Sequence, residues 1–297
     1  MSARAMISRA MVSRGVIARS RNWLLAYPAA MLGVFFLGPF SIMLAVSFFQ
    51  RVENAFYEPA FVLSNYARLM SDLFIGNLVF SLSLSMLVAA VSVSIAFPFT
   101  YLLTRLRPRW QTLWLVFLLS VLSLSEVIVA FSWSVLLSKT AGVSNVFVWL
   151  GLLSEPESYT PGLIAEVFGY GYLTLPYTVL MLYPQMSRLD PQLMEAARTM
   201  GASPQRAFVN VLIPVMRRPI VASLILVFVF TLGIYLIPQI LGQPQHWTLS
   251  VLITDQAIYQ SNVPFAAALA VFLLLTSLAL IALTFLVGGR QNVGRTI

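Results

Sequence analysis

Residues 187–219 read SRLDPQLMEAARTMGASPQRAFVNVLIPVMRRP, and they form the most organised polar stretch of the chain. Asp190 and Pro191 are typical of the first turn of a helix, where aspartate caps free N–H groups and proline needs no hydrogen-bond partner. Gly201 allows the left-handed backbone that ends a helix, and Ser203–Pro204 begins a second one. Apolar residues recur at helical spacing through the first helix, at Leu189, Leu193, Ala196, Ala197 and Met200. The spacing predicts a helix–turn–helix whose first helix has an apolar face that nothing in the loop itself covers.

Long apolar stretches lie on both sides of this loop, and others precede them. Of 297 residues, 59% are hydrophobic and only 9% are charged, against roughly 25% charged in a soluble domain. A helix needs about 20 apolar residues to cross a bilayer. The fold class is therefore all-α, a polytopic membrane protein with six transmembrane helices. The spans are expected near residues 23–49, 74–104, 110–138, 161–186, 220–241 and 264–287.

The positive charges set the orientation of these spans. Fifteen of the 18 Lys and Arg residues lie in alternate segments: the N-terminal tail 1–22, the segment after the second span, the loop 187–219 and the C-terminal tail 290–297. Cytoplasmic segments carry the excess of Lys and Arg in membrane proteins. We therefore expect both termini and the loop 187–219 to be cytoplasmic, with residues 23–289 as the transmembrane domain.

Several function classes are excluded or disfavoured by the residues present. The net charge of +8 is explained by membrane orientation, so nucleic acid is not an expected partner. Without cysteine and with a single histidine, His246, we expect no metal site. The sole lysine, Lys139, is not in a phosphate-binding GxxxxGK[ST] sequence. We expect no catalytic residues and no cofactor in this chain, although an intramembrane enzyme using Glu126 and Glu166 as an acid/base pair stays open.

The loop also carries a resemblance to a known family. Glu195-Ala196-Ala197, then Gly201, then Val211-Leu212-Ile213-Pro214, resembles the EAA loop of binding-protein-dependent ABC importer permeases of type I. The departures are Val211 for isoleucine and Ile213 for leucine. Two shorter patches, Leu63-Ser64-Asn65-Tyr66 and Pro238-Gln239-Ile240-Leu241-Gly242, are similar to the spermidine/putrescine-type branch.

The resemblance implies a transport subunit of a bacterial inner membrane, with the type I permease fold. The implied partners are two ATPase subunits that bind ATP and Mg²⁺, a second, similar permease and an external solute-binding protein. The first helix of the loop would be the coupling helix that docks on an ATPase. The coupling residues carried over from the motif are Glu195, Ala196, Ala197, Met200, Gly201 and Pro214.

Two carboxylates lie inside apolar stretches, Glu126 and Glu166. A charged group facing lipid is costly, so both should face protein or water. Together with Trp133, Tyr170 and Tyr172 they form a candidate cation site, because ammonium groups bind to carboxylates and to aromatic faces. We expect these residues on the solute path. The alternatives are a structural hydrogen bond from Glu126 to a neighbouring helix, and an interfacial Glu166 that reaches water.

A polyamine is the expected solute, from the branch resemblance and the acid pair. An opine, an amino-phosphonate, thiamine and ferric iron remain alternatives within the same transporter class. An ion-coupled secondary transporter is the alternative from another class, which the loop and the lack of an internal repeat argue against.

Overall fold

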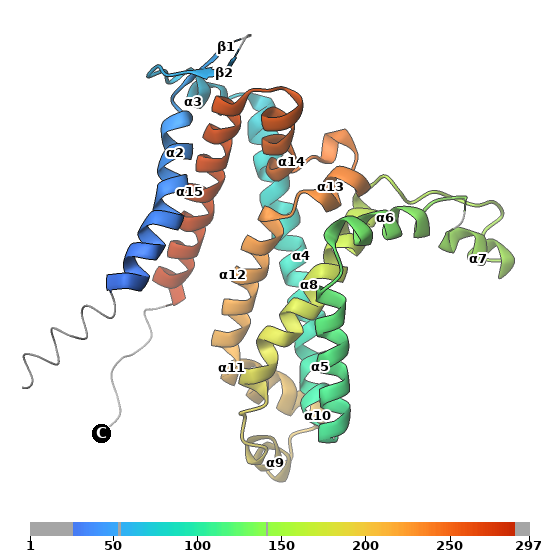
Figure 1. The fold of residues 1–297 in the computed structure, drawn as a ribbon. Coiled ribbons are helices and arrows are strands. Elements are labelled where there is room, and N and C mark those ends of the chain that lie inside the picture. Colours follow the sequence, from blue (N-terminus) through green and yellow to red (C-terminus); the bar gives the residue numbers. More distant parts are fainter. Residues whose placement is uncertain (1–25, 53–54, 141, 289–297) are drawn as a thin grey trace, which may run out of the picture.

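The computed structural model describes residues 26–52, 55–140 and 142–288, which are almost entirely helical apart from one antiparallel hairpin (Figure 1). The first elements along the chain are η1 (Gly33–Leu37), α2 (Gly38–Val46), β1 (Gln50–Val52), β2 (Ala55–Glu58) and α3 (Ser64–Arg68). Next come α4 (Asp72–Thr104), α5 (Pro108–Leu122), α6 (Glu126–Leu136), α7 (Val143–Trp149) and α8 (Leu163–Met186). The loop and the second half contain α9 (Gln192–Thr199), α10 (Pro204–Ala207), η2 (Phe208–Leu212), α11 (Ile213–Val215), α12 (Arg217–Gly233), α13 (Leu236–Leu241), η3 (Pro244–His246), α14 (Leu249–Thr254), η4 (Asp255–Tyr259) and α15 (Val263–Gly288).

The centre of the molecule is a bundle in which α4 packs against both α8 and α12, and α8 also packs against α5. Small residues line the contact: Ala89 of α4 is fully buried in a cluster with Val227 and Phe228 of α12. Ser92 and Thr174 share a buried hydrogen bond of 2.7 Å between α4 and α8. Small and hydroxyl side chains are what membrane helices use to approach closely, because lipid gives them no hydrophobic drive to associate. α2 and α15 pair beside this bundle (Figure 1).

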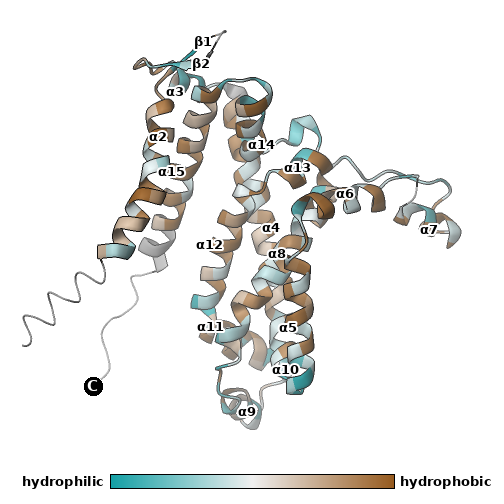
Figure 2. Ribbon diagram, in the orientation of Figure 1, coloured by the Kyte–Doolittle hydropathy of each residue, from teal (hydrophilic) through white to brown (hydrophobic). Residues whose placement is uncertain are grey.

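Apolar residues cover the long helices, and hydrophilic residues gather at their ends (Figure 2). Within the described part of the chain, three helices are long and apolar enough to cross a membrane: Ala26–Val46, Phe74–Thr104 and Val263–Ala282. The number rises to five if each of two bent helix pairs is one span. α8 has 24 residues, about 36 Å at 1.5 Å per residue, which exceeds the roughly 30 Å of a bilayer core. The expected count of six spans stays a prediction.

The expectation of one continuous helix over 110–138 is wrong. Pro108–Leu122 and Glu126–Leu136 meet at 92°. Ser123 donates its hydroxyl to the carbonyl of Ser120 at 2.7 Å, and Ser125 has an extended backbone before α6 begins. Serine side chains that bond to the nearby backbone compete with helix continuation. Glu126 is therefore the first residue of a helix turned away from α5, and not a residue deep in a straight span.

The stretch 220–241 is also interrupted. α12 ends at Gly233, Ile234 is extended, and α13 begins at Leu236. Pro204–Val215 and Arg217–Gly233 form the second bent pair, at 71°. α12 thus has a break at each of its ends.

Candidate functional site

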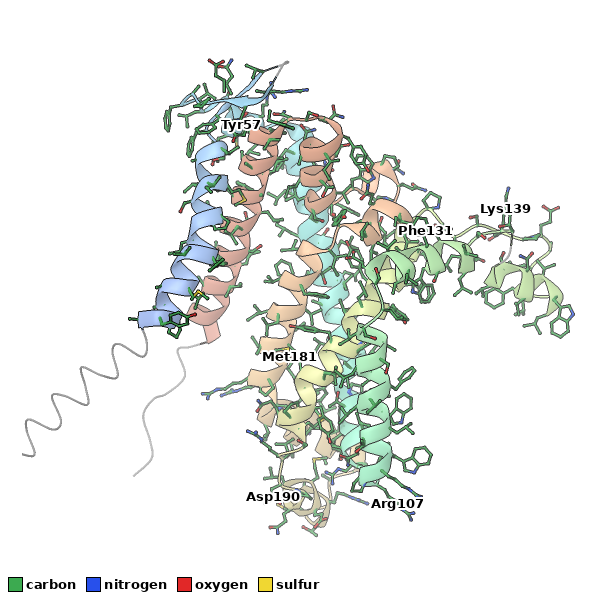
Figure 3. The ribbon with its side chains drawn as sticks, viewed as in Figure 1. Tyr57, Arg107, Phe131, Lys139, Met181 and Asp190 are labelled. Carbon is green, nitrogen blue, oxygen red and sulfur yellow. The ribbon has the colours of Figure 1, made fainter. Side chains whose placement is uncertain are left out.

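The loop 187–219 folds as the predicted helix–turn–helix at one end of the bundle. Asp190 accepts a 2.9 Å hydrogen bond from the Gln192 N–H, so it caps α9 as expected. Gly201 has a φ of +89°, the left-handed conformation that favours glycine. The Ser203 hydroxyl accepts from the Arg206 N–H, which begins α10. In Figure 3, Asp190 and Arg107 lie at the same end of the molecule and Tyr57 at the opposite end.

The faces of α9 differ from the expected ones. Ala197 is 4% exposed and Met194 is also buried, whereas Glu195 and Ala196 are exposed and Met200 is 83% exposed. The expectation that the loop covers none of the apolar face is wrong, because Met194 and Ala197 pack within a cluster that includes α10 and η2. Ala197 therefore faces its own chain. Gly201 and Pro214 are exposed, so these two share the surface with Glu195, Ala196 and Met200.

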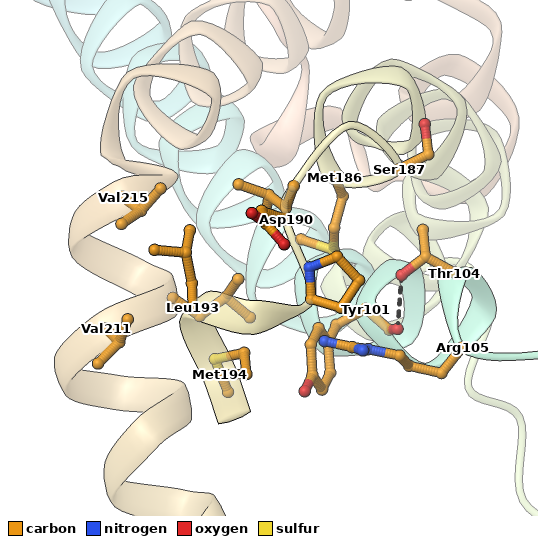
Figure 4. Close-up of a pocket in the computed structure, with 13 residues that line it drawn as sticks. Tyr101, Thr104, Arg105, Met186, Ser187, Asp190, Leu193, Met194, Val211 and Val215 are labelled. Atoms are coloured by element: carbon orange, nitrogen blue, oxygen red, sulfur yellow. Dashed lines mark hydrogen bonds between the residues drawn. The ribbon is translucent and has the colours of Figure 1, made fainter. Parts of the chain in front are cut away.

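A pocket of about 100 Å³ separates the base of α9 from the bundle (Figure 4). Its lining comes from four places: the end of α4, the end of α8, the start of α9 and the turn η2–α11. Arg105 lies over the ring of Tyr101 at 5.1 Å, on the α4 side of the pocket. Leu193, Val211 and Val215 lie on the opposite side (Figure 4). The start of α9 therefore has free space beside it, whereas Met194 and Ala197 are packed against the rest of the chain.

Packing joins α9 to three long helices. Met194 and Ala197 belong to the same buried cluster as Leu103 of α4, Leu118 of α5 and Met186 of α8. Close-packed interiors transmit displacement because they contain little free volume.

A hydrogen-bonded link lies beside this cluster. The Tyr183 hydroxyl donates to Gln111 at 2.7 Å, and the Gln111 amide donates to the carbonyls of Thr104 and Leu106. These hydrogen bonds therefore connect the ends of α4, α5 and α8 beside the loop.

At the other end of the bundle, a hydrogen bond of Glu126 connects the break between α5 and α6 with the break between α12 and α13. Its Oε1 accepts a 3.1 Å hydrogen bond from the backbone N–H of Leu236, 110 residues away in the chain. Leu236 is the first residue of α13, and its N–H has no partner within that helix. Ser250 holds the other side of the same break, where its hydroxyl donates to the carbonyl of Ile234 at 2.7 Å.

Glu166 lies close to this place but is fully enclosed, with 0% exposure. Within the described residues neither of its carboxylate oxygens has a hydrogen-bond partner. It packs under Gly242, where a Cβ atom would collide with Glu166 Oε1 and with the carbonyl of Pro238. Glu166 lines neither the pocket at the base of α9 nor the hollow described below.

The three expected aromatic residues gather around the same two helices. Trp133 of α6 stacks on Phe168 at 5.4 Å and meets Tyr172 edge-on at 6.4 Å. Tyr170 is fully buried, in the cluster against which Trp133 and Tyr172 also pack. The structure thus brings together all five residues expected on the solute path, but Glu166 and Tyr170 have no exposed surface in it.

A hollow of about 440 Å³ opens beside Glu126. Among the described residues that line it, Glu126 is the one ionisable side chain. The others are apolar: Leu124, Leu173, Val229, Phe230, Gly233 and Ile234. Phe230 stacks on Tyr177 at 5.1 Å, which fixes an aromatic face near this hollow.

Sequence reasoning missed two sets of contacts, one at Glu126 and one at Asn65. The partner of Glu126 is a backbone N–H exposed by a helix break, and only Gly233 and the nearby Pro238 gave a signal of it. The patch Leu63–Tyr66 is explained by the structure: buried Asn65 donates to the carbonyls of Ser47 and Phe49, both at 3.0 Å. It therefore holds the outer end of the first long helix.

Known transport proteins are similar to this chain over most of its length. The chain is 28% identical to the spermidine/putrescine transport system permease protein PotB of Escherichia coli, over 82% of this chain and 88% of that protein. The protein of the same name from Haemophilus influenzae is also 28% identical, over 80% of this chain and 83% of its own length. The inner membrane ABC transporter permease protein YdcU of Escherichia coli is 25% identical, over 82% of each.

A solved structure shows the same fold. It is the crystal structure of a bacterial ABC transporter involved in the import of the acidic polysaccharide alginate, one chain of which superposes with a TM-score of 0.70 at 19% identity, over 94% of this chain and 99% of that one. The model of one protein family matches residues 97–292, from the second half of α4 to beyond α15. This chain belongs to that family, the binding-protein-dependent transport system inner membrane components.

Proposed function

We propose that this subunit of an ABC importer forms the path for a small cationic solute, and that the solute is a polyamine such as spermidine or putrescine. The observation that carries the proposal is the hollow beside Glu126, which has one negative charge and an otherwise apolar lining. Polyamines are chains of methylene groups with ammonium groups between them, so a carboxylate and apolar walls match both parts. The relatives named for spermidine and putrescine transport support the same solute.

The charge of this site argues against an anionic solute. The structural neighbour imports an acidic polysaccharide, and a carboxylate in a partly dehydrated hollow repels such a solute. Phe230, which lines the hollow and stacks on Tyr177, adds an aromatic face that ammonium groups favour.

We further propose that α9 is the coupling helix. Glu195, Ala196 and Met200 are exposed at its surface, where a separate ATPase that binds ATP and Mg²⁺ can contact them. Gly201 and Pro214 shape the surface beside them. Ala197 acts differently: it packs inward and transmits force to the bundle through the cluster with Leu103, Leu118 and Met186.

The assembly we propose contains two ATPase subunits, a second permease similar to this one and an external solute-binding protein. ATP binding would stabilise one packing of the bundle relative to the other, because a ligand shifts a two-state equilibrium by the difference between its affinities for the two states. The pocket beside Leu193 and Asp190 gives the start of α9 room to tilt as this happens.

Solute uptake tests the proposal directly. Cells or vesicles with the complete importer should accumulate labelled spermidine or putrescine in the presence of ATP and the binding protein. Excess thiamine, opine, amino-phosphonate or ferric iron should not compete. Accumulation driven by an ion gradient without ATP, or competition by one of those compounds and not by polyamines, would contradict it.

A further inference from the structure

We propose that Glu126 is a switch residue at which the cationic solute and the backbone of α13 compete for one carboxylate. When the cation is bound, α13 is released; when the cation leaves, Glu126 binds Leu236 again and the outer side closes. This inference rests on the proposed cationic solute, and it adds how the solute is linked to closure.

The first support is that one side chain belongs to both places. Glu126 Oε1 accepts from the Leu236 N–H at 3.1 Å, and the same residue lines the hollow. Gly233 and Ile234, which form the break before α13, line the hollow as well. A solute in the hollow therefore touches the carboxylate and the break together.

The second support is that α13 closes over α8. Ile237 and Leu241 are fully buried. They meet the backbone of α8 at Gly169, where a Cβ atom would lie 2.7 Å from Leu241 Cδ1 and 3.0 Å from Ile237 Cγ2. The Gly162 N–H donates to the Leu241 carbonyl at 2.7 Å, at the far end of α13. We call this contact of α13 with Gly162–Tyr170 the outer seal.

The third support is that the two ends of the outer seal are held unequally. At Leu241 the seal has a backbone hydrogen bond and the Leu241 side chain packed over Gly169, and Ile237 packs on the same glycine between the two ends. At Leu236 it has one hydrogen bond to a half-buried side chain, Glu126. Broken helices in transporters place free backbone groups next to the solute in this way. The Leu236 end is therefore the one that a solute can release.

The chemistry of the competition follows from charge. An ammonium group offers a charged donor to the carboxylate, so the attraction between two opposite charges adds to the hydrogen bond, and the neutral N–H of Leu236 cannot supply that attraction. Glu126 thus favours the cation when the hollow is occupied. Coupling of this kind is reciprocal, so a solute that loosens α13 is itself held less tightly once α13 closes. Closure then drives the solute away from the outer side.

The experiment uses the complete importer in lipid nanodiscs, with spermidine as the probe. This chain contains no cysteine, so Ile237→Cys gives it one thiol, buried under the outer seal beside the Leu236 end that is expected to lift. The rate at which a water-soluble maleimide labels that thiol reports how often α13 lifts. We expect spermidine to raise the rate about fivefold, the effect of releasing one hydrogen bond.

Two substitutions separate the charge of Glu126 from its hydrogen bond. Glu126→Gln keeps an oxygen that accepts from Leu236 but has no charge, so labelling should stay slow with or without spermidine. Glu126→Ala removes the acceptor, so labelling should be fast in both conditions. Glu157→Gln, which changes an exposed carboxylate of the outer loop, is the matched control and should respond to spermidine as the parent does.

Each result decides between the two proposals. A full spermidine response in Glu126→Gln, or slow labelling in Glu126→Ala without solute, would overturn the switch while leaving polyamine import intact. If the unsubstituted importer accumulates no polyamine, the proposed function fails instead. In that case, the labelling rates of Glu126→Ala and of the parent, compared without solute, still test whether Glu126 holds α13.

Discussion

At the scale of single residues, the contact between α8 and α13 depends on two glycines, which leave room for neighbouring side chains and backbone. Gly169 admits the side chains of Ile237 and Leu241, and Gly242 admits the carboxylate of Glu166. Close approach through small residues is the general means by which membrane helices pack. The two glycines act on different neighbours, because one meets flexible side-chain ends and the other meets a carboxylate and a backbone carbonyl.

Gly242→Ala should therefore destabilise the protein. The added methyl group collides with Glu166 and with the carbonyl of Pro238, and neither the buried acid nor the backbone can move freely. We expect a cost of about 1–3 kcal/mol, as for overpacked interiors, seen as a lower midpoint of thermal unfolding in detergent. Gly171→Ala is the control, since nothing lies within 4 Å of a Cβ at that position. Equal midpoints for the two variants would contradict the prediction.

At the scale of elements, α9 presents one alanine to the outside and the next to its own bundle. Ala196 is exposed and Ala197 is 4% exposed. Successive helical residues point about 100° apart, so one short helix can serve a partner and a core at once. The proposed coupling helix would thus be both a docking surface and a part of the cluster that joins α4, α5 and α8.

The two alanines should respond differently to the same change. Ala196→Arg should weaken copurification of the ATPase at least about tenfold, because a long charged side chain blocks the docking surface, and it should leave thermal stability unchanged. Ala197→Arg should lower stability by about 3 kcal/mol or more, because it buries an unpaired charge. Retained ATPase with Ala196→Arg would remove α9 from the proposed docking surface.

At the scale of the whole molecule, the ends of the bundle differ in chemistry. One end has Arg107, Asp190 and the loop 187–219, and the other has the hairpin at Tyr57 (Figure 3). The excess of Lys and Arg at the first end predicts that it is cytoplasmic. The outer seal then lies on the opposite side of the membrane from the coupling helix, as alternating access requires.

Accessibility of single cysteines tests this orientation. A membrane-impermeant maleimide added to intact cells should label Lys139→Cys and should not label Met200→Cys, which should react only after the membrane is opened. A fluorescent protein fused after Ile297 should fluoresce, since it folds in the cytoplasm. Labelling of Met200→Cys from outside would reverse the topology and place the coupling loop on the wrong side.

The sequence by itself determined the membrane environment, the helix–turn–helix of 187–219 and the resemblance to the importer family. These follow from composition and from spacing within a few residues, which local chemistry controls. The caps at Asp190 and Ser203 and the left-handed Gly201 are of this kind.

Only the tertiary structure decided where the long helices break and which residues meet. The 92° turn before Glu126 and its bond to Leu236 join segments 110 residues apart, and no local pattern encodes such a contact. The same holds for Ala197, since a helical stripe shows which residues share a face but not what covers it. Burial is a property of the neighbours that arrive, and these come from distant parts of the chain.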